Sequence, residues 1–192
     1  PDEVLLVDHI SGDATGETIR VTGMGREKIY AGVTRIYAFG GSGNDRLVGG
    51  KRGDLVFGGS GNDLLDAEGN GHHHGNGADA LFGDGYESFG DLLSGKKVTA
   101  PGNDTIRGGR GNDLIFGDNG SGGSAGGDDL IEGGRGNDLM FGEGGNDTLV
   151  GGRGGDIMDG GAGADVFVYG HADESRGRDV DLIRNFVQGQ DR

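Results

Sequence analysis

Apolar residues recur with a period of nine between residues 133 and 168, each two places after an acidic residue. The four units read GGRGNDLMF, GEGGNDTLV, GGRGGDIMD and GGAGADVFV. Each has glycine at most of positions 1, 2 and 4, aspartate at position 6 and a large apolar residue at position 8. Glycine suits tight turns, and three residues with an apolar centre suit a short strand with one buried side chain. The pattern predicts a parallel coil of turn, short strand, turn, short strand.

The same period starts at Gly40 and runs through GGSGNDRLV, GGKRGDLVF and GGSGNDLLD to Asp66. Insertions near 67–78, 83–90, 95–103 and 117–128 then interrupt it. Between them, aspartates with an apolar residue two places on keep the phase at Asp79, Asp91, Asp104, Asp113 and Asp129. All the insertions fall in predicted turns, where a solenoid tolerates extra residues. We therefore expect one repeat domain over residues 40–168.

The two ends of the chain lack the glycine repeat. Within residues 1–39, alternating apolar segments bounded by glycine predict short strands at Val4–Val7, Thr18–Val21, Lys28–Ala31 and Arg35–Phe39. Terminal units of a solenoid are usually atypical because they cover an open edge. We expect residues 1–39 and 169–192 to cap the coil. Pro1 looks like a cut end, so the chain is expected to be a piece of a larger protein.

The composition limits the possible functions. The chain has 192 residues with 48 glycines, 2 prolines and no cysteine, and its formal net charge is −15. Such acidity argues against nucleic-acid binding and favours hard cations. Without cysteine there is neither a disulfide framework nor a thiolate metal site, although secretion is not excluded. No apolar run reaches membrane-spanning length, and the first residues do not show the pattern of a signal peptide.

The aspartates at position 6 indicate calcium binding. Two units of nine complete one coil, so every second aspartate stacks on the same side, about 4.7–4.9 Å apart. Ionised carboxylates at that spacing repel one another and disfavour folding. Calcium accepts six to eight oxygens, carboxylates and backbone carbonyls included, in tolerant geometry. Two stacked turns can offer two aspartates and four carbonyls, which is a suitable set.

The nonapeptide resembles the calcium-binding repeat of RTX proteins, a match of sequence pattern rather than a derivation. The phrases GADVFVY and DLIRNFVQGQD resemble the closing segment of serralysin-type RTX domains. That family usually has aspartate where Asn185 stands and continues with an apolar strand after Asp191, so the final cap is expected to be incomplete at Arg192. The resemblance implies an all-β fold, a right-handed parallel β-roll (β-solenoid) with calcium ions in the turns and irregular capping strands at both ends.

The resemblance also implies the ligands: carbonyls at positions 2 and 4 of one turn, carbonyls at positions 1 and 3 of the next stacked turn, and both aspartates. It pairs the turn of Asp45 with that of Asp63, the turn of Asp113 with that of Asp138, and the turn of Asp138 with that of Asp156. We expect roughly eight or more calcium ions. The candidate metal-binding residues are Gly41, Gly43, Asp45, Gly50, Arg52, Asp54, Gly58, Gly59, Ser60, Gly61, Asp63, Gly75, Gly77, Asp79, Gly83, Gly85, Asp91, Gly102, Asp104, Gly108, Gly109, Arg110, Gly111, Asp113, Gly117, Asn119, Gly127, Asp129, Gly133, Gly134, Arg135, Gly136, Asp138, Gly142, Gly144, Gly145, Asp147, Gly151, Gly152, Arg153, Gly154, Asp156, Gly160, Ala162, Asp165 and Asp181.

Other motifs are weaker. His72–His74 lies between glycines in the first insertion, where clustered histidines can bind zinc or nickel but a polar loop is the simpler interpretation. Residues 122–126 match the nucleophile-elbow pattern without a strand-to-helix context, and no HExxH motif occurs. We expect no catalytic residues and no organic cofactor in this chain.

The residues at positions 7 and 9, which point outward from the coil, predict that one outer face is apolar. On alternate units these positions carry Leu64, Leu92, Leu114, Phe116, Leu139, Phe141 and Ile157. The opposite face includes Thr105, Arg107, Glu132 and Thr148. Such a face marks either simple strand propensity or a contact with a neighbouring domain or a second chain.

The RTX resemblance implies a calcium-binding module of a secreted bacterial exoprotein, at the cell surface or outside the cell. Such modules leave unfolded through a type I secretion channel and fold outside in calcium. The chain could instead be the non-catalytic C-terminal part of an exoenzyme such as a metalloprotease, lipase or epimerase. It could also be a structural stretch of a toxin, adhesin or surface-layer protein. Calcium ions and a neighbouring domain of the parent protein are the expected partners.

Overall fold

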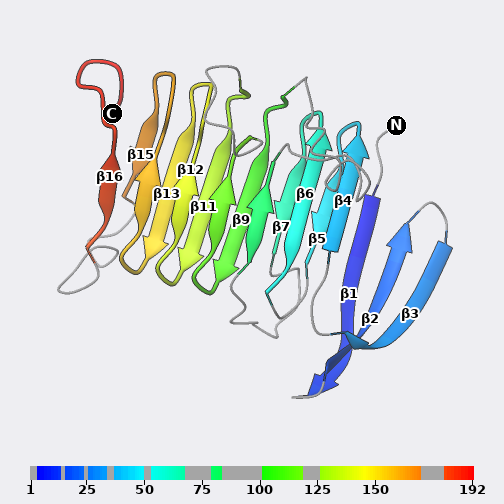
Figure 1. The fold of residues 1–192 in the computed structure, drawn as a ribbon. Helices are drawn as coiled ribbons and strands as arrows, with labels where there is room; N and C mark the ends of the chain where they lie inside the picture. Colours follow the sequence, from blue (N-terminus) through cyan, green and yellow to red (C-terminus); the bar gives the residue numbers. More distant parts are fainter. Residues whose placement is uncertain are drawn as a thin grey trace, which may run out of the picture.

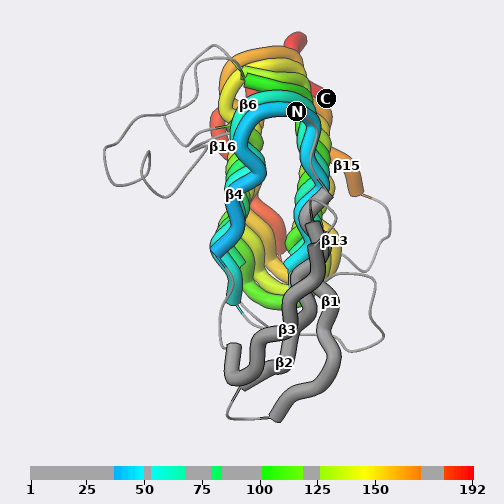
Figure 2. Tube along the Cα trace, turned by 90° about the vertical axis from the view of Figure 1, so that its right-hand side faces the viewer, coloured from blue at the N-terminus to red at the C-terminus, as the bar shows by residue number. Residues whose placement is uncertain are grey.

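The chain forms a flattened coil of short parallel strands, preceded by three antiparallel strands (Figure 1). The computed structural model describes residues 4–13, 16–23, 26–33, 37–49, 53–67, 79–83, 101–118, 126–169 and 180–192. These ranges contain sixteen strands and no helix, and therefore no helix long and apolar enough to cross a membrane. Viewed along its axis, the coil is two facing walls joined by turns at both edges (Figure 2). It is a right-handed parallel β-roll.

Strands alternate between the two walls because each nine-residue unit crosses from one wall to the other. One wall is a nine-stranded sheet in the order β15-β13-β11-β9-β7-β5-β1-β2-β3, and the other is a seven-stranded sheet in the order β16-β14-β12-β10-β8-β6-β4, counted over the described residues. The coil strands of the first sheet are β5 (Arg46–Val48), β7 (Leu64–Asp66), β9 (Thr105–Arg110), β11 (Leu130–Arg135), β13 (Thr148–Arg153) and β15 (Val166–Val168). Those of the second are β4 (Tyr37–Ser42), β6 (Leu55–Ser60), β8 (Ala80–Phe82), β10 (Leu114–Phe116), β12 (Leu139–Phe141), β14 (Ile157–Asp159) and β16 (Leu182–Arg184).

The first residues of the chain extend one wall of the coil. Strands β1 (Val4–Asp13), β2 (Gly16–Gly23) and β3 (Arg26–Val33) pair antiparallel in succession. β1 also pairs in parallel with β5, with Val4 opposite Arg46. These strands are longer than expected, but they lie where the sequence places them, and they occupy the edge of β5 that would otherwise be open.

The core is one apolar residue per unit, at position 8. These side chains point inward from both walls and most are completely buried, as are Leu65, Ile115 and Met158. The residues on either side of each point outward and are partly exposed, as the strand alternation requires. Burial of each large apolar side chain contributes about 1.5–3 kcal/mol. So narrow a core makes the turns unusually important for stability.

The strands on either side of the segment 83–104, β8 and β9, lie on opposite walls, whereas the two crossings expected from the sequence would return the chain to the same wall. β7 pairs directly with β9, and β8 pairs directly with β10. No further strand therefore lies between β7 and β9 or between β8 and β10, and the repeat unit expected to end at Leu93 falls outside the described residues. Asp91 itself, with residues 84–100, lies outside the described residues. The physical reason is that an insertion changes loop length without necessarily adding a crossing.

The outer face of the seven-stranded sheet is apolar, as expected, but its members differ from the prediction. Phe116 stands opposite Phe141, and Leu114 opposite Leu139. Leu64 lies on the other sheet, opposite Thr105, and Leu92 lies outside the described residues. The prediction assumed two crossings between Phe82 and Thr105, an even number, but these residues lie on opposite walls. Every unit before the insertion therefore lies on the wall opposite to the predicted one. Leu55, Phe57, Ala80 and Phe82 therefore join the apolar face instead.

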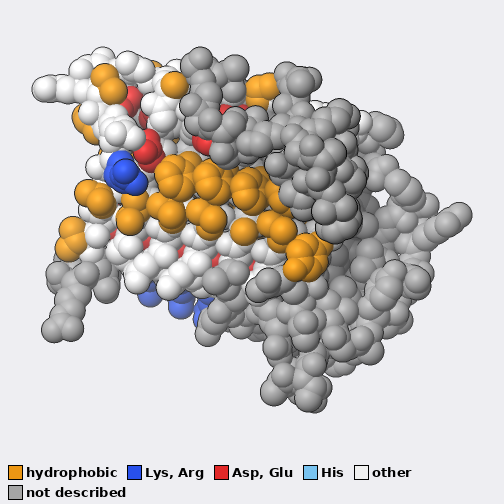
Figure 3. Space-filling view, in the orientation of Figure 1, with side chains coloured by type: hydrophobic (Ala, Val, Ile, Leu, Met, Phe, Trp, Pro, Cys, Tyr) orange, Lys and Arg blue, Asp and Glu red, His pale blue; other side chains and the backbone are white. Residues whose placement is uncertain are grey.

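A ladder of stacked rings runs along this face. Phe39, Phe57, Phe82, Phe116 and Phe141 stack in turn, with ring centroids 4.8–5.1 Å apart and planes within 18° of parallel. Figure 3 shows the apolar side chains gathered in a continuous band. The opposite wall carries polar outward residues, including an ion pair between Arg107 and Glu132 with N and O 2.8 Å apart. The two outer faces thus differ as the sequence predicted.

Candidate metal centre

The turns between strands are shaped by glycines that cannot be replaced without displacing neighbouring atoms. In the turn before β12, Gly134 and Gly136 have φ values of 114° and 132°, in the region that favours glycine. A Cβ on Gly134 would collide with the carbonyl oxygen of Gly109 in the turn below. A Cβ on Gly133 would lie 2.5 Å from Oδ2 of Asp138. The first glycine of the unit therefore leaves room beside the carboxylate.

The position-6 aspartates form two hydrogen-bonded columns, one along each edge of the roll. Within a column, each aspartate backbone N–H donates to Oδ1 of the next aspartate, with N and O 2.6–3.2 Å apart. The first column consists of Asp45, Asp63, Asp104, Asp129, Asp147, Asp165 and Asp191. The second column consists of Asp54, Asp79, Asp113, Asp138, Asp156 and Asp181.

The second carboxylate oxygen defines the candidate site. Oδ2 is buried without a hydrogen-bond partner in six aspartates of the described turns: Asp63, Asp104, Asp129, Asp138, Asp147 and Asp165. An unpartnered buried polar atom is costly, and a buried ionised carboxylate is more so. Such atoms, facing glycine-lined turns, suit a bound cation. No group of three or more histidine or acidic side chains converges on one point in the described residues, so a site must combine stacked aspartates with carbonyls. Calcium accepts that oxygen set.

Burial raises the pKa of these carboxyl groups. The pKa rises to about 7 in Asp63, to about 8 in Asp104 and to about 9 in Asp129. Desolvation is the largest cause, and the N–H of the neighbouring aspartate partly opposes it. The adjacent carboxylates of the column raise the pKa further. Without a cation, the folded roll therefore holds protons that the unfolded chain would release.

A second ladder lies outside the aspartates, at position 5. Here the N–H of the later residue donates to the side-chain oxygen of the earlier one. Asn62 N donates to Asn44 Oδ1 at 3.1 Å, and Asn103 N to Asn62 Oδ1 at 3.0 Å. This direction is opposite to that of the aspartate columns. The Asn-Asp dipeptide of the repeat thus clamps each turn to both neighbours, a role that sequence reasoning did not assign to asparagine.

The three turn pairs expected from the sequence do stack. Asp45 N donates to Asp63 Oδ1 at 2.8 Å, Asp113 N to Asp138 Oδ1 at 2.9 Å, and Asp138 N to Asp156 Oδ1 at 2.9 Å. Gly134 also lies in register with Gly109 and Gly152. The candidate residues outside the described residues are Gly50, Arg52, Gly75, Gly77, Gly85, Asp91 and Asn119. Direct ligation by individual carbonyls stays a prediction.

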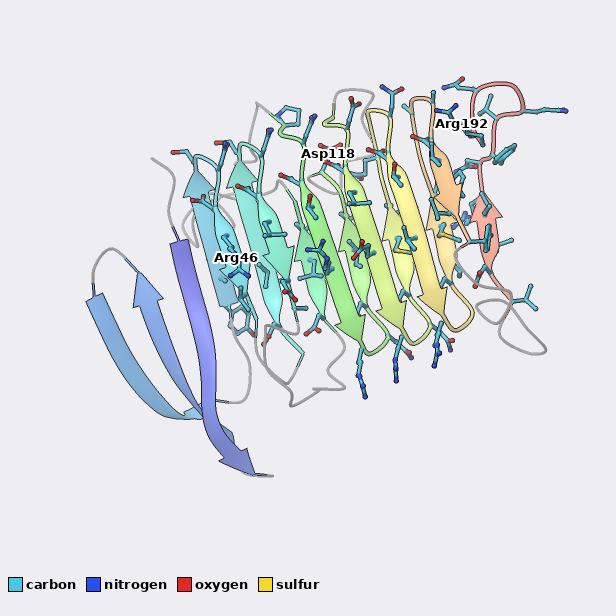
Figure 4. All side chains as sticks on the ribbon, turned by 180° about the vertical axis from the view of Figure 1, so that it is seen from behind. Arg46, Asp118 and Arg192 are labelled. Carbon is cyan, nitrogen blue, oxygen red and sulfur yellow. The ribbon has the colours of Figure 1, made fainter. Side chains whose placement is uncertain are left out.

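Two acidic residues of the site were missed by sequence reasoning. Asp191 Oδ1 accepts a hydrogen bond from Asp165 N at 3.2 Å, and its Oδ2 accepts one from Val187 N at 2.7 Å. Asp191 therefore ends the first column. Asp118 is buried in the first-column turn after β10 and is labelled in Figure 4. A signal for Asp118 was available, because it follows a position-1 glycine directly, as Asp84 and Glu143 also do. Asp191 lacks the apolar residue two places on that marked the others.

Comparison with known families gives one assignment. The model of the RTX calcium-binding nonapeptide repeat matches four copies, over residues 39–70, 99–122, 125–158 and 141–170, which together cover more than half of the chain. This chain is a member of the RTX calcium-binding nonapeptide repeat family. The RTX matches leave out most of the insertion between β8 and β9. Searches of curated proteins and of solved structures give no significant match. The molecule is thus a calcium-binding RTX β-roll module.

Proposed function

We propose that calcium drives the folding of this module outside the cell, as part of a secreted bacterial exoprotein exported by type I secretion. The observation that carries the proposal is the set of buried, unpartnered Oδ2 atoms in the stacked turns. In a calcium-poor cytosol, repulsion within the columns opposes folding, and the narrow core compensates weakly. In calcium-rich surroundings, ion binding supplies folding free energy. RTX membership supports the secreted setting.

The role within the parent protein is non-catalytic in this proposal. The described residues use their buried acidic groups in the columns, and no histidine lies among them beyond the strand β1. The module would serve as the folding-competent C-terminal part of an exoenzyme. A structural stretch of a toxin, adhesin or surface-layer protein is the alternative, and the extended apolar face favours a contact of that kind.

The test is circular dichroism of the full chain with EGTA and with millimolar calcium. We expect coil in EGTA and strand signal in calcium. Magnesium at the same concentration should restore little strand, because it requires a small octahedral site and retains its water. Full strand content in EGTA would contradict calcium-driven folding. Isothermal titration calorimetry of the chain with calcium measures the number of bound ions, and we expect about eight.

A further inference from the structure

Asp118 places an additional carboxylate inside the first aspartate column. It occupies the turn between β10 and β11 and is 2% exposed. Its Oδ1 accepts a hydrogen bond from Gly127 N, and its Oδ2 accepts one from Gly144 N, both at 3.2 Å. Gly144 belongs to the next stacked turn, before β13. Asp118 therefore ties two successive turns of the column together while bringing in a negative charge.

The negative charge of Asp118 acts on three aspartates of the first column. In Asp104, Asp129 and Asp147 the pKa is raised mainly by burial, and the charge of Asp118 is among the causes that raise it further. Each of these three aspartates is at least 97% buried and has an unpartnered Oδ2. Asp129 lies between Asp104 and Asp147 in the column, so the charge of Asp118 acts on three successive carboxylates. Negative charge near a ligand set increases its affinity for a cation.

The second column has the opposite surroundings. Its turns carry Arg110, Arg135 and Arg153 at position 3, in register with one another. Only the flanking Asp113 and Asp156 contribute repulsive charge to the raised pKa of Asp138, after burial as the main cause. Figure 3 shows basic side chains gathered along one edge of the roll. A cation approaching this edge meets the positive charge of these three arginines, which have no counterpart at position 3 of the described first-column turns.

We propose that Asp118 makes the two sites on either side of Asp129 the tightest cation sites of the roll, so that they fill first. One site lies between Asp104 and Asp129, and the other between Asp129 and Asp147. Asp118 acts as a positioning and charge-supplying residue rather than a ligand, because both its oxygens already accept amide hydrogen bonds. The inference rests on the proposed calcium-dependent function. It adds an order of filling and the residue that sets this order.

The test compares Asp118→Asn with Asp128→Asn in the full chain. Asp128 lies in the same turn but is exposed, and its Oδ1 accepts Asn146 N at 2.7 Å. Each variant removes one negative charge at nearly constant size. Calcium is titrated by calorimetry, and terbium by luminescence. Asp118→Asn should weaken the tightest class about tenfold for calcium and about thirtyfold for terbium, because Coulomb energy scales with ionic charge. Asp128 also raises the pKa of Asp147, after burial and the charges of Asp165 and Asp118. Asp128→Asn should nevertheless change either affinity less than about twofold, since exposed charges are screened.

The readouts separate electrostatics from simple destabilisation. A folding defect would weaken calcium and terbium by the same factor, and that result would overturn the proposal. Equal effects of the two variants, or loss of a bound ion in Asp118→Asn, would also overturn it. If Asp118→Asn does not fold, the wild-type chain decides by amide NMR in a calcium titration. The Asp129 and Asp147 amides should reach their calcium-bound positions at lower calcium than the Asp138 and Asp156 amides, and the reverse order would place the tightest class on the second column and overturn the proposal. A wild-type chain that binds no calcium would instead refute the proposed function.

Discussion

Single aspartates in this roll serve two neighbours at once. Asp138 donates its N–H to Asp156 in one direction and accepts the N–H of Asp113 in the other, while its Oδ2 remains without a partner. A cation on either side of it would share this carboxylate. Loss of one aspartate from a regular run should therefore damage two sites rather than one.

Replacement of Asp138 should raise the calcium midpoint strongly. In Asp138→Ala, two candidate sites lose a carboxylate and Asp113 N loses its acceptor, so we expect an increase of about tenfold or more, equivalent to about 1.4 kcal/mol. Asp91→Ala is the comparison, and it should shift the midpoint less, because Asp91 follows an insertion and Phe89 stands where a regular unit has its position-4 glycine. A calcium titration followed by circular dichroism measures both. Equal shifts in the two variants would contradict the dependence on regular turns.

At the level of elements, each strand carries two separate functions. Its central residue fills the core, while its outward residues build a face that neither the core nor the turns require. On the seven-stranded sheet this face combines the phenylalanine ladder with aliphatic residues such as Leu114 and Leu139. The ladder stabilises neighbouring coils, since offset aromatic pairs contribute about 0.5–1.5 kcal/mol beyond burial. It also leaves an apolar surface open to a partner.

The double variant Phe116→Ser with Phe141→Ser should separate these two roles. We expect calcium stoichiometry to be unchanged, because neither side chain points into the roll, and the thermal midpoint in calcium to fall by several degrees. Self-association or docking of a restored parent domain should weaken, as sedimentation velocity would detect. Thr105→Ser with Thr148→Ser on the opposite wall is the control. If wild type in calcium is monomeric and a parent domain docks elsewhere, the face reflects strand propensity alone.

Across the whole molecule, the two columns make stability depend on pH as well as on calcium. The raised pKa values mean that the folded, ion-free roll binds more protons than the unfolded chain between about pH 4 and pH 9. Stability of that state therefore falls as pH rises through this window. Calcium reverses the trend, because it binds the ionised form and displaces the protons.

Acidification in EGTA should therefore recover structure that is missing at pH 8. We expect strand signal to increase as the pH falls from about 8 to about 5, and the apparent calcium affinity to decrease over the same range. Circular dichroism at constant ionic strength tests the first effect, and calorimetry in buffers of different ionisation enthalpy tests proton release. A calcium-free chain that loses strand on acidification would show that the buried carboxyl groups do not control folding.

The sequence alone was sufficient for the features that repeat. Position 8 faces inward, position 6 supplies the columns and glycine shapes the turns, because each property arises within one unit and the next unit repeats it. From the spacing, the β-roll, its core and the stacking of Asp45 with Asp63 could be predicted before any coordinates. The polar wall at Thr105 and Glu132 could be predicted in the same way.

Only the tertiary structure decided what happens at the irregular turns. An insertion has no period, so its length does not reveal how many times the chain crosses between walls. For that reason the spacing across 83–104 does not reveal that Leu64 lies on the same wall as Thr105, and the prediction that it belongs to the apolar face is wrong. Asp118 and Asp191 likewise join the first column through contacts with Gly144 and Asp165, which are distant in sequence. Strand pairing fixes these positions, because each coil must satisfy its backbone hydrogen bonds on the coil already beside it.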